Sequence, residues 1–294
     1  MIISFNIVDS IVEIVKDEKN VLQGIYYQKK NMQEMFSKFP ELLFIDATYK
    51  LNDLRMPLYI MMVVDGNGDS EIVALWIVTS EDRISIKNMV RIFKRHNSTD
   101  RTVCIMSDKD MTERDVLSEE IPNAVLQICL FHTLRSFKRE ISTEKLHITS
   151  DQRQMTLEII TKLVYSKNKT KYQQHYQELI DTQLKPVIDY FNKNWHAIRA
   201  EWVEGLKNDA CNFLNRTNNR LEAINQKIKS VVQKYSSLVK FFQDLLKCLD
   251  SLELERDHRA ITIFQKAPVQ LYTSESALYH YHLLLTPYAF SFLK

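Results

Sequence analysis

The sequence predicts an α/β fold in which helices sandwich a mixed β-sheet, with an all-helical insertion before the last helix of the core. Short apolar blocks follow one another over residues 42–78, strand-like and helical segments alternate over 83–140, and only helical spacing occurs over 144–207. The 294 residues, 45% of them hydrophobic, suffice for a large buried core. With only four glycines and six prolines, glycine-rich phosphate loops and propellers are disfavoured.

Residues 1–40 are expected to form a helical lead-in. Ile11, Ile14 and Val15 recur at a spacing of three to four, and a second apolar set follows from Met32 to Phe36.

The first part of the core is expected over residues 41–143. Three strands are predicted in LLFIDATY, LYIMMVV and EIVALWIV, and the separator 65–69 contains the Asp-Gly and Asn-Gly steps of tight hairpins. Because these blocks are almost continuously apolar, helices should cover both faces of the sheet.

Alternating elements complete this part of the core. A helix around Ile86, a strand ending at Ser107-Asp108, a helix from about Thr112, a strand over 124–128 and a helix from about Leu130 give the order β-β-β-α-β-α-β-α. This order describes a ribonuclease H-like arrangement and not a doubly wound nucleotide fold.

The rest of the chain is expected to be mainly helical. A helical insertion is predicted over 144–214, helices that complete the core over 215–258, and an irregular C-terminal tail over 259–294.

Charge, cysteine content and hydropathy indicate which classes of protein are disfavoured. The formal net charge is only +2, so any affinity for nucleic acid must depend on local patches. The four cysteines form no C-x-x-C pair, and the N-terminus has neither the basic region nor the cleavage site of a signal peptide. The longest apolar runs have seven residues, so we expect no membrane partner.

Three acidic residues are candidates for metal-dependent chemistry. Asp46 lies inside an apolar strand, Asp108 follows the end of a later strand, and Glu222 begins a helix. Structural roles stay open for each. Asp46 could pair with Lys50 or a backbone amide, Asp108 could be a turn or helix-cap residue, and Glu222 could form a capping box with Asn219.

Four motifs occur in an informative order: FIDATYKLN around Asp46, SDKD around Asp108, CLFH from Cys129 to His132, and TNNRLEAIN around Glu222. Together they resemble the signature of Mutator-like transposase domains. The resemblance is greatest to the transposase-derived domain of SWIM-type zinc finger proteins, and it spans roughly residues 35–290.

The resemblance implies a role for each motif. Asp46, Asp108 and Glu222, separated by 62 and 114 residues, match a DDE triad that holds two Mg²⁺ or Mn²⁺ ions during attack on a phosphodiester. Cys129 and His132 match the C-x-x-H signature of the family. Since no second pair stands at zinc-finger spacing, we interpret them as site-shaping or structural residues and expect no structural zinc.

The sequence also departs from the family. It contains neither an N-terminal zinc module nor a C-x-C…C-x-H SWIM motif, which fits a fragment or a domesticated form. We expect ancestral DNA cleavage and strand transfer, with retained activity left open. A non-catalytic nuclear DNA-binding or interaction scaffold, and a nuclease that does not transpose, are the alternatives.

DNA is the expected partner, and two basic segments are candidates to bind it. Residues 207–234 contain six basic and two acidic residues, and a second cluster follows His132. The predicted DNA-binding residues are Lys207, Arg216, Arg220, Lys227, Lys229, Arg135 and Lys138. A solvated helical face explains the charges equally well.

Trp195 and Trp202 could stack on a base, although core packing at this spacing is the simpler interpretation. A homodimer stays open, and nuclear residence follows only from the resemblance.

Overall fold

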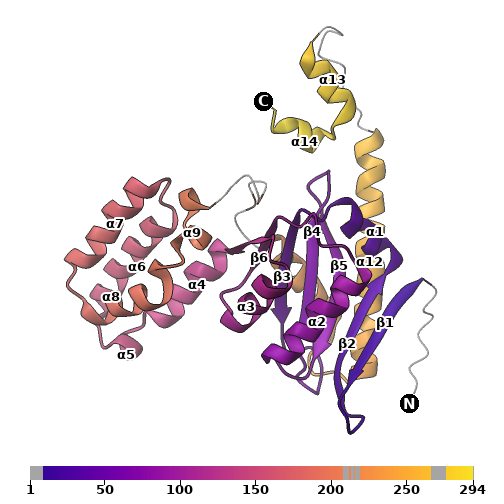
Figure 1. Cartoon of the computed structure of the whole chain (residues 1–294), viewed down its shortest axis with the longest axis horizontal. Coiled ribbons are helices and arrows are strands. Elements are labelled where there is room, and N and C mark those ends of the chain that lie inside the picture. The colour runs from indigo at the N-terminus through magenta and orange to yellow at the C-terminus, as the bar shows by residue number, and fades with distance from the viewer. Residues whose placement is uncertain (1–8, 208–211, 213–214, 216–218, 266–275, 294) are drawn as a thin grey trace. The chain divides into compact units, whose positions relative to one another are not determined.

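The computed structural model describes residues 9–207, 212, 215, 219–265 and 276–293. Seven strands form one mixed sheet in the order β1-β2-β5-β4-β3-β6-β7, and many helices accompany it (Figure 1). The predicted α/β class is therefore confirmed. The chain divides into two compact units: unit 1 takes its residues from 1–40, 46–99 and 220–294, and unit 2 from 41–45 and 100–219.

The sheet contains antiparallel and parallel pairs. In unit 1, β1 pairs antiparallel with β2, β2 with β5, and β5 with β4. In unit 2, the first residues of β3 pair parallel with β6, and β6 with β7. The strands are β1 (Ser10–Lys16), β2 (Leu22–Lys29), β3 (Leu42–Thr48), β4 (Leu58–Val64), β5 (Ser70–Val78), β6 (Cys104–Ser107) and β7 (Val125–Ile128).

The hairpin predicted from the Asp-Gly and Asn-Gly steps is present between β4 and β5. Gly68 adopts a φ of +78°, a backbone conformation that glycine reaches without strain. The amide of Gly68 donates to the carbonyl of Asp65 over 3.0 Å and closes the turn.

The prediction of a helical lead-in over residues 1–40 is wrong for residues 10–29. This segment forms the hairpin of β1 and β2, and only Lys30–Lys38 is helical, as α1. Ile11, Ile14 and Val15 are β-branched residues that favour strands when a neighbouring strand is available. Asn20 at a φ of +62° and the side chain of Asp17, which accepts from the amides of Lys19 and Val21, form the turn.

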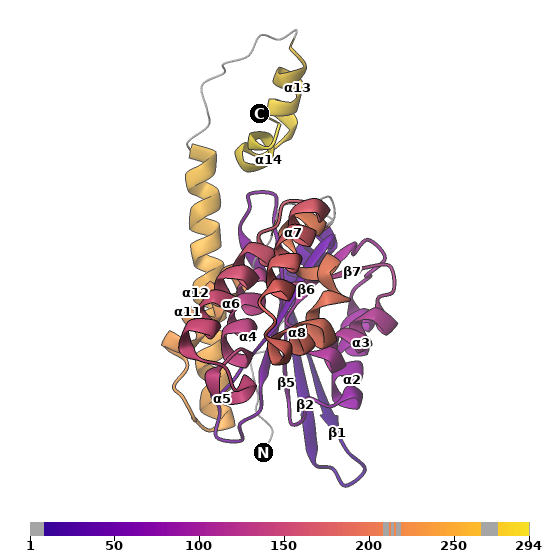
Figure 2. The ribbon, with the colours of Figure 1, turned by 90° about the vertical axis from the view of Figure 1, so that its left-hand side faces the viewer.

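Helices lie on both faces of the unit 1 part of the sheet. Figures 1 and 2 show α2 on one face and α11 with α12 on the other. Asp82 begins α2 by accepting a hydrogen bond from the amide of Ser85 over 2.8 Å. The helices of unit 1 are α1, α2 (Arg83–His96), α11 (Asn219–Val231), α12 (Leu238–Gln265), α13 (Ala277–Leu284) and α14 (Pro287–Ser291).

The prediction of an irregular tail over residues 259–294 is also wrong, because the described part of this segment is largely helical. Helix α12 continues to Gln265, and two short helices follow. Ser276 and Thr286 accept hydrogen bonds from the amides of Leu278 and Ala289, and Pro287 occupies the first turn of α14. These are ordinary helix-start signals, carried by single residues of the sequence.

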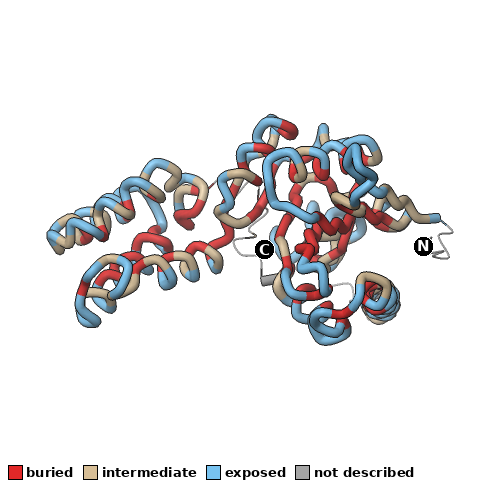
Figure 3. Tube along the Cα trace, turned by 90° about the horizontal axis from the view of Figure 1, so that it is seen from below, coloured by how far each residue is buried: buried red, intermediate tan, exposed pale blue. Residues whose placement is uncertain are grey.

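The described residues of unit 2 are mainly helical outside its short strands. Its helices are α3 (Met111–Glu120), α4 (Leu130–Glu140), α5 (Thr143–Leu146), α6 (Ser150–Val164), α7 (Lys169–Asp181), α8 (Lys185–Phe191), the π-helix η1 (Asn192–His196), α9 (Arg199–Trp202) and the 3-10 helix η2 (Glu204–Leu206). Residues 143–206 contain no strand. Strands β3, β4, β5 and β6 are almost entirely buried, whereas β1 has no buried residue. Figure 3 shows buried and exposed stretches along the whole trace.

Aromatic side chains form the core of the helical insertion. Trp195 and Trp202 are 1% and 0% exposed, and their rings pack against each other with centroids 5.7 Å apart. Phe137 lies 4.3 Å from Trp195 and 5.8 Å from Trp202. Both tryptophans are therefore core residues, and base stacking by them is ruled out in this conformation.

Candidate active site

Asp46 is a buried carboxylate at the polar end of an apolar strand. Its side chain is 8% exposed, and its Oδ2 accepts a 2.7 Å hydrogen bond from Nδ2 of Asn225 on α11. Its Oδ1 accepts from the amide of Ala47 over 2.9 Å. These donors offset the desolvation of the charge, so the backbone amide foreseen as an alternative partner is present together with a side-chain donor.

Glu222 lies on the same helix as Asn225, one turn earlier. Residues three apart on a helix share a face, so the face of α11 that contacts Asp46 also carries Glu222. Glu222 is half-buried and stands in the first turn of α11, where the helix dipole favours a negative charge.

Asn225 is a site residue that the sequence reasoning missed. It lies in the motif around Glu222, and its side chain is 6% exposed. The available signal was the i, i+3 spacing, which places a polar amide beside Glu222 on the edge of an apolar stripe.

Asp108 follows β6 in unit 2 and contacts His132 of α4. Nδ1 of His132 contacts Oδ1 of Asp108; the aspartate side chain is 43% exposed and the histidine side chain 12%. The helix-cap role considered for Asp108 belongs to Asp110, which accepts from the amide of Glu113 over 2.8 Å. Asp108 is therefore not needed as the cap of α3.

The two residues of the C-x-x-H motif differ in environment. Cys129 is fully buried and precedes α4, and its carbonyl accepts from the hydroxyl of Thr133 over 2.9 Å. His132 lies one turn into the helix and reaches Asp108. The motif therefore combines a core residue with a polar residue that contacts a candidate metal ligand.

The register of two parallel strands relates the first two candidate acids. β3 pairs with β6 from Leu42 opposite Cys104 to Phe44 opposite Met106. Asp46 comes two residues after Phe44 along one strand, and Asp108 comes two residues after Met106 along the other. Both acids thus stand at the carboxyl ends of neighbouring parallel strands, an edge at which α/β folds commonly carry their polar chemistry.

Two cations of unit 2 lie near the end of β6. Arg114 is buried, forms an ion pair with Glu201 of α9, and lies 3.5 Å from the hydroxyl of Ser107. Burial raises the pKa of Glu201, and the charge of Arg114 opposes that rise. The ammonium group of Lys109 lies 4.3 Å from the ring centroid of Trp195.

The predicted DNA-binding residues fall into different environments. Arg135 and Lys138 are exposed on α4, and Lys229 is exposed on α11. Lys227 is also exposed and forms an ion pair with Glu255 of α12. Arg220 donates to the carbonyl of Gly68, which ties α11 to the hairpin of β4 and β5.

The prediction that Lys207 belongs to a basic surface patch is wrong. It is only 6% exposed, and its Nζ donates to the carbonyl of Ile128 at the end of β7 over 2.6 Å. Its role is to satisfy a buried carbonyl, so it is not a surface cation for phosphate. Arg216 lies outside the described residues.

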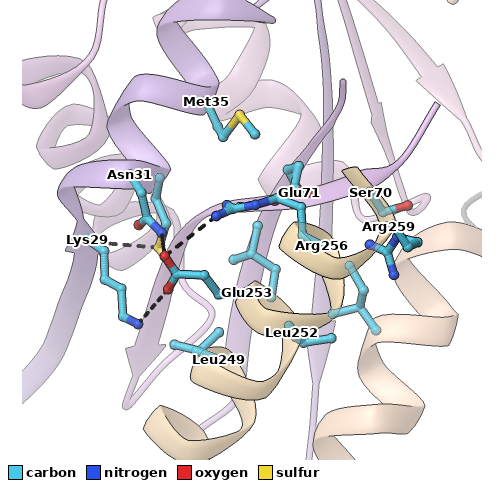
Figure 4. Close-up of a pocket in the computed structure, with 13 residues that line it drawn as sticks. Lys29, Asn31, Met35, Ser70, Glu71, Leu249, Leu252, Glu253, Arg256 and Arg259 are labelled. Carbon is cyan, nitrogen blue, oxygen red and sulfur yellow. Dashed lines mark hydrogen bonds and ion pairs between the residues drawn. The ribbon is translucent and has the colours of Figure 1, made fainter. Parts of the chain in front are cut away.

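A separate cavity of about 50 Å³ lies in unit 1, between the start of α1, β5 and α12 (Figure 4). Its polar lining includes Lys29, Glu71, Glu253 and Arg256, and none of the predicted site residues lines it. Burial raises the pKa of Glu71 to about 7, although Arg256 approaches its Oε2 to 3.6 Å. Two buried acceptor atoms here, Oε1 of Glu71 and Oδ1 of Asn31, lack a hydrogen-bond partner among the described residues.

Two findings bear on the class of protein. Within the described ranges, no helix has both the length and the apolar character needed to span a bilayer. Residues 5–127 match the family model for the RNaseH-like domain of zinc finger SWIM domain-containing proteins 1 and 3. The matched segment includes Asp46 and Asp108 and ends before Cys129, His132 and Glu222. Residues 5–127 are thus similar to the RNaseH-like domain of zinc finger SWIM domain-containing protein 1/3.

Proposed function

We propose that this RNaseH-like domain is transposase-derived and cleaves DNA with divalent metal ions held by Asp46, Asp108 and Glu222. The observation that carries the proposal is the matched position of Asp46 and Asp108, each two residues beyond a paired position of β3 and β6. Equal steps along two parallel strands reach neighbouring positions, so the register favours a ligand shared by both acids.

The donor set fits Mg²⁺ or Mn²⁺. All three acids supply hard oxygen ligands, which these ions prefer, and such ions would activate a nucleophile and stabilise the leaving oxygen of a phosphodiester. Glu222 shares a helix face with Asn225, whose amide holds Asp46. A third carboxylate is thereby available on the side of Asp46.

The remaining residues of the site orient the acids. Asn225 fixes one oxygen of Asp46, and His132 holds one oxygen of Asp108. Such outer contacts limit the rotation of a ligating carboxylate and tune its basicity. Exposed Arg135 and Lys138 on α4 and Lys229 on α11 are available to neutralise DNA phosphates.

Calorimetric titration with Mn²⁺, followed by a nicking assay on labelled duplex DNA, tests the proposal. The unmodified chain should bind Mn²⁺ and nick DNA, and Asp108→Asn should lose both. Asp189→Asn is the matched control, because Asp189 is an exposed acid of α8 and should leave both unchanged. Absence of Mn²⁺ binding by the unmodified chain would exclude the catalytic function.

A non-catalytic nuclear DNA-binding or interaction scaffold is the second candidate. It is favoured by the contacts of Asp46, whose two oxygens already accept hydrogen bonds from Ala47 and Asn225. Duplex binding without Mn²⁺ binding would support this scaffold. If nicking occurs, joining of the cut end to a second duplex separates a transposase from a simple nuclease, and gel filtration reports whether the homodimer forms.

A further inference from the structure

Lys109 is a cation with a fixed position directly after Asp108. Its Nζ lies 4.3 Å from the ring centroid of Trp195, within the range of a cation–π interaction. The indole of Trp195 is itself held in place, since its Nε1 donates to the hydroxyl of Tyr190 over 3.0 Å and Phe137 packs 4.3 Å from it. The aromatic core of the helical insertion therefore supports a lysine side chain beside a candidate metal ligand.

Within the described part of the chain, Lys109 has no carboxylate partner. The acids on either side of it in the chain are engaged, since Asp108 contacts His132 and Asp110 caps α3. Lys109 is half-buried. Burial, and to a lesser degree the positive charge of Arg114, disfavours the charged form of its ammonium group. A partly desolvated ammonium group beside another cation is unfavourable unless an anion accompanies it.

We infer that Lys109 binds a phosphate of the DNA backbone next to Asp108, with Trp195 as the platform that orients its side chain. This inference rests on the proposed function, because it names a contact to the same substrate. An ammonium donor forms short charge-assisted hydrogen bonds to phosphate oxygens. Because the ring already limits the rotamers of Lys109, less side-chain entropy is lost when the phosphate binds.

The test measures binding of a fluorescent 20-base-pair duplex by anisotropy across a salt series, in EDTA so that no strand is cut. Lys109→Met should bind several-fold more weakly, and its plot of log affinity against log salt should be less steep by about one unit. Lys109→Arg keeps the charge and should restore the slope. Lys185→Met removes an exposed charge from α8 of the same unit and should match the unmodified chain.

A purely structural role for Lys109 predicts a different result. Met can still pack on Trp195, so a role limited to the cation–π contact would lower the melting temperature of Lys109→Met and leave the salt slope unchanged. That outcome, or failure of the unmodified chain to bind the duplex at 50 mM salt, would overturn the inference.

Mn²⁺ calorimetry separates this inference from the proposed function. Lys109→Met should bind Mn²⁺ as the unmodified chain does, because it leaves all three acids in place. If the unmodified chain binds no Mn²⁺ but Lys109→Met still reduces the salt slope, the phosphate contact stands and the catalytic proposal fails. If the unmodified chain binds Mn²⁺ and Lys109→Met leaves the salt slope unchanged, the phosphate contact fails and the catalytic proposal stands.

Discussion

Asn225 of α11 donates a 2.7 Å hydrogen bond from Nδ2 to Oδ2 of Asp46, joining a helix near the C-terminus to a strand near the N-terminus across 179 residues of sequence. The amide is 6% exposed and the carboxylate 8%. In this buried setting the hydrogen bond fixes both the position of α11 on β3 and the orientation of a candidate metal ligand.

Asn225→Ala should weaken Mn²⁺ binding about 10- to 100-fold, since loss of an outer-shell donor leaves the ligating carboxylate free to rotate. Calorimetric titration measures the affinity, and circular dichroism verifies that the variant is folded. Ser230→Ala, an exposed residue near the C-terminal end of α11 and two turns from Glu222, is the control and should retain full affinity. Equal affinity in both variants would mean that Asn225 has only a structural role.

Gly205→Ala should destabilise unit 2 strongly. A Cβ atom at this position would lie 2.0 Å from the carbonyl carbon and oxygen of Lys167, so the backbone must shift. We expect a loss of about 1–3 kcal/mol or more in the free energy of unfolding, measured by urea denaturation. Gly66→Ala is the control, because its Cβ would meet no atom closer than 3.6 Å, and a loss similar to that of Gly205→Ala would contradict the steric argument.

Glu71 should make stability depend on pH. Its pKa is raised from 4.5 to about 7 in the folded chain, chiefly by burial, so the folded state binds its proton more tightly than the unfolded state. This contribution is fully present below pH 4.5 and is lost as the pH rises through 7, by about 3 kcal/mol in total.

Denaturation curves collected between pH 4 and 8 for the unmodified chain and Glu71→Gln check this prediction. The glutamine stays neutral, so the difference in unfolding free energy between the two proteins should shift progressively in favour of the variant as the pH rises. A constant difference over this range would show that Glu71 does not titrate there.

Arg114→Met should cost about 2–3 kcal/mol of stability, because it leaves Glu201 half-buried without its cation. The double variant Arg114→Met with Glu201→Gln should recover most of that loss, since no isolated charge remains. Urea denaturation of the single and double variants provides a complete cycle. Additive losses would indicate that the ion pair contributes no coupling energy.

The sequence patterns predicted the central strands and the helices that follow them more accurately than the ends of the chain. The apolar blocks around Asp46 and the Asp-Gly turn carry local signals, which the structure confirms as β3, β4, β5 and their hairpin. Ile11 and Ile14 carry no such local signal, because their spacing fits a helix and only pairing with β2 makes them a strand.

In the candidate site, too, the sequence predicts features with a local signal and misses those that depend on tertiary packing. The acids could be selected because charged residues in or next to apolar strands are unusual, whereas the burial of Lys207 and the contact of Asn225 depend on tertiary packing. From the sequence alone, Lys207 cannot be distinguished from a surface cation. Only the structure shows that it donates a hydrogen bond to the carbonyl of Ile128.

The interleaving of the two units has a consequence for the order of folding during synthesis. Unit 2 has all its segments once residue 219 has left the ribosome, whereas unit 1 requires residues from 220 onward. Until α11 and α12 emerge, one face of β2, β4 and β5 lacks its helical cover and resembles an exposed aggregation-prone sheet. A nascent chain arrested when residue 219 has just left the ribosome should therefore hold a protease-resistant helical insertion and recruit chaperones to the N-terminal strands.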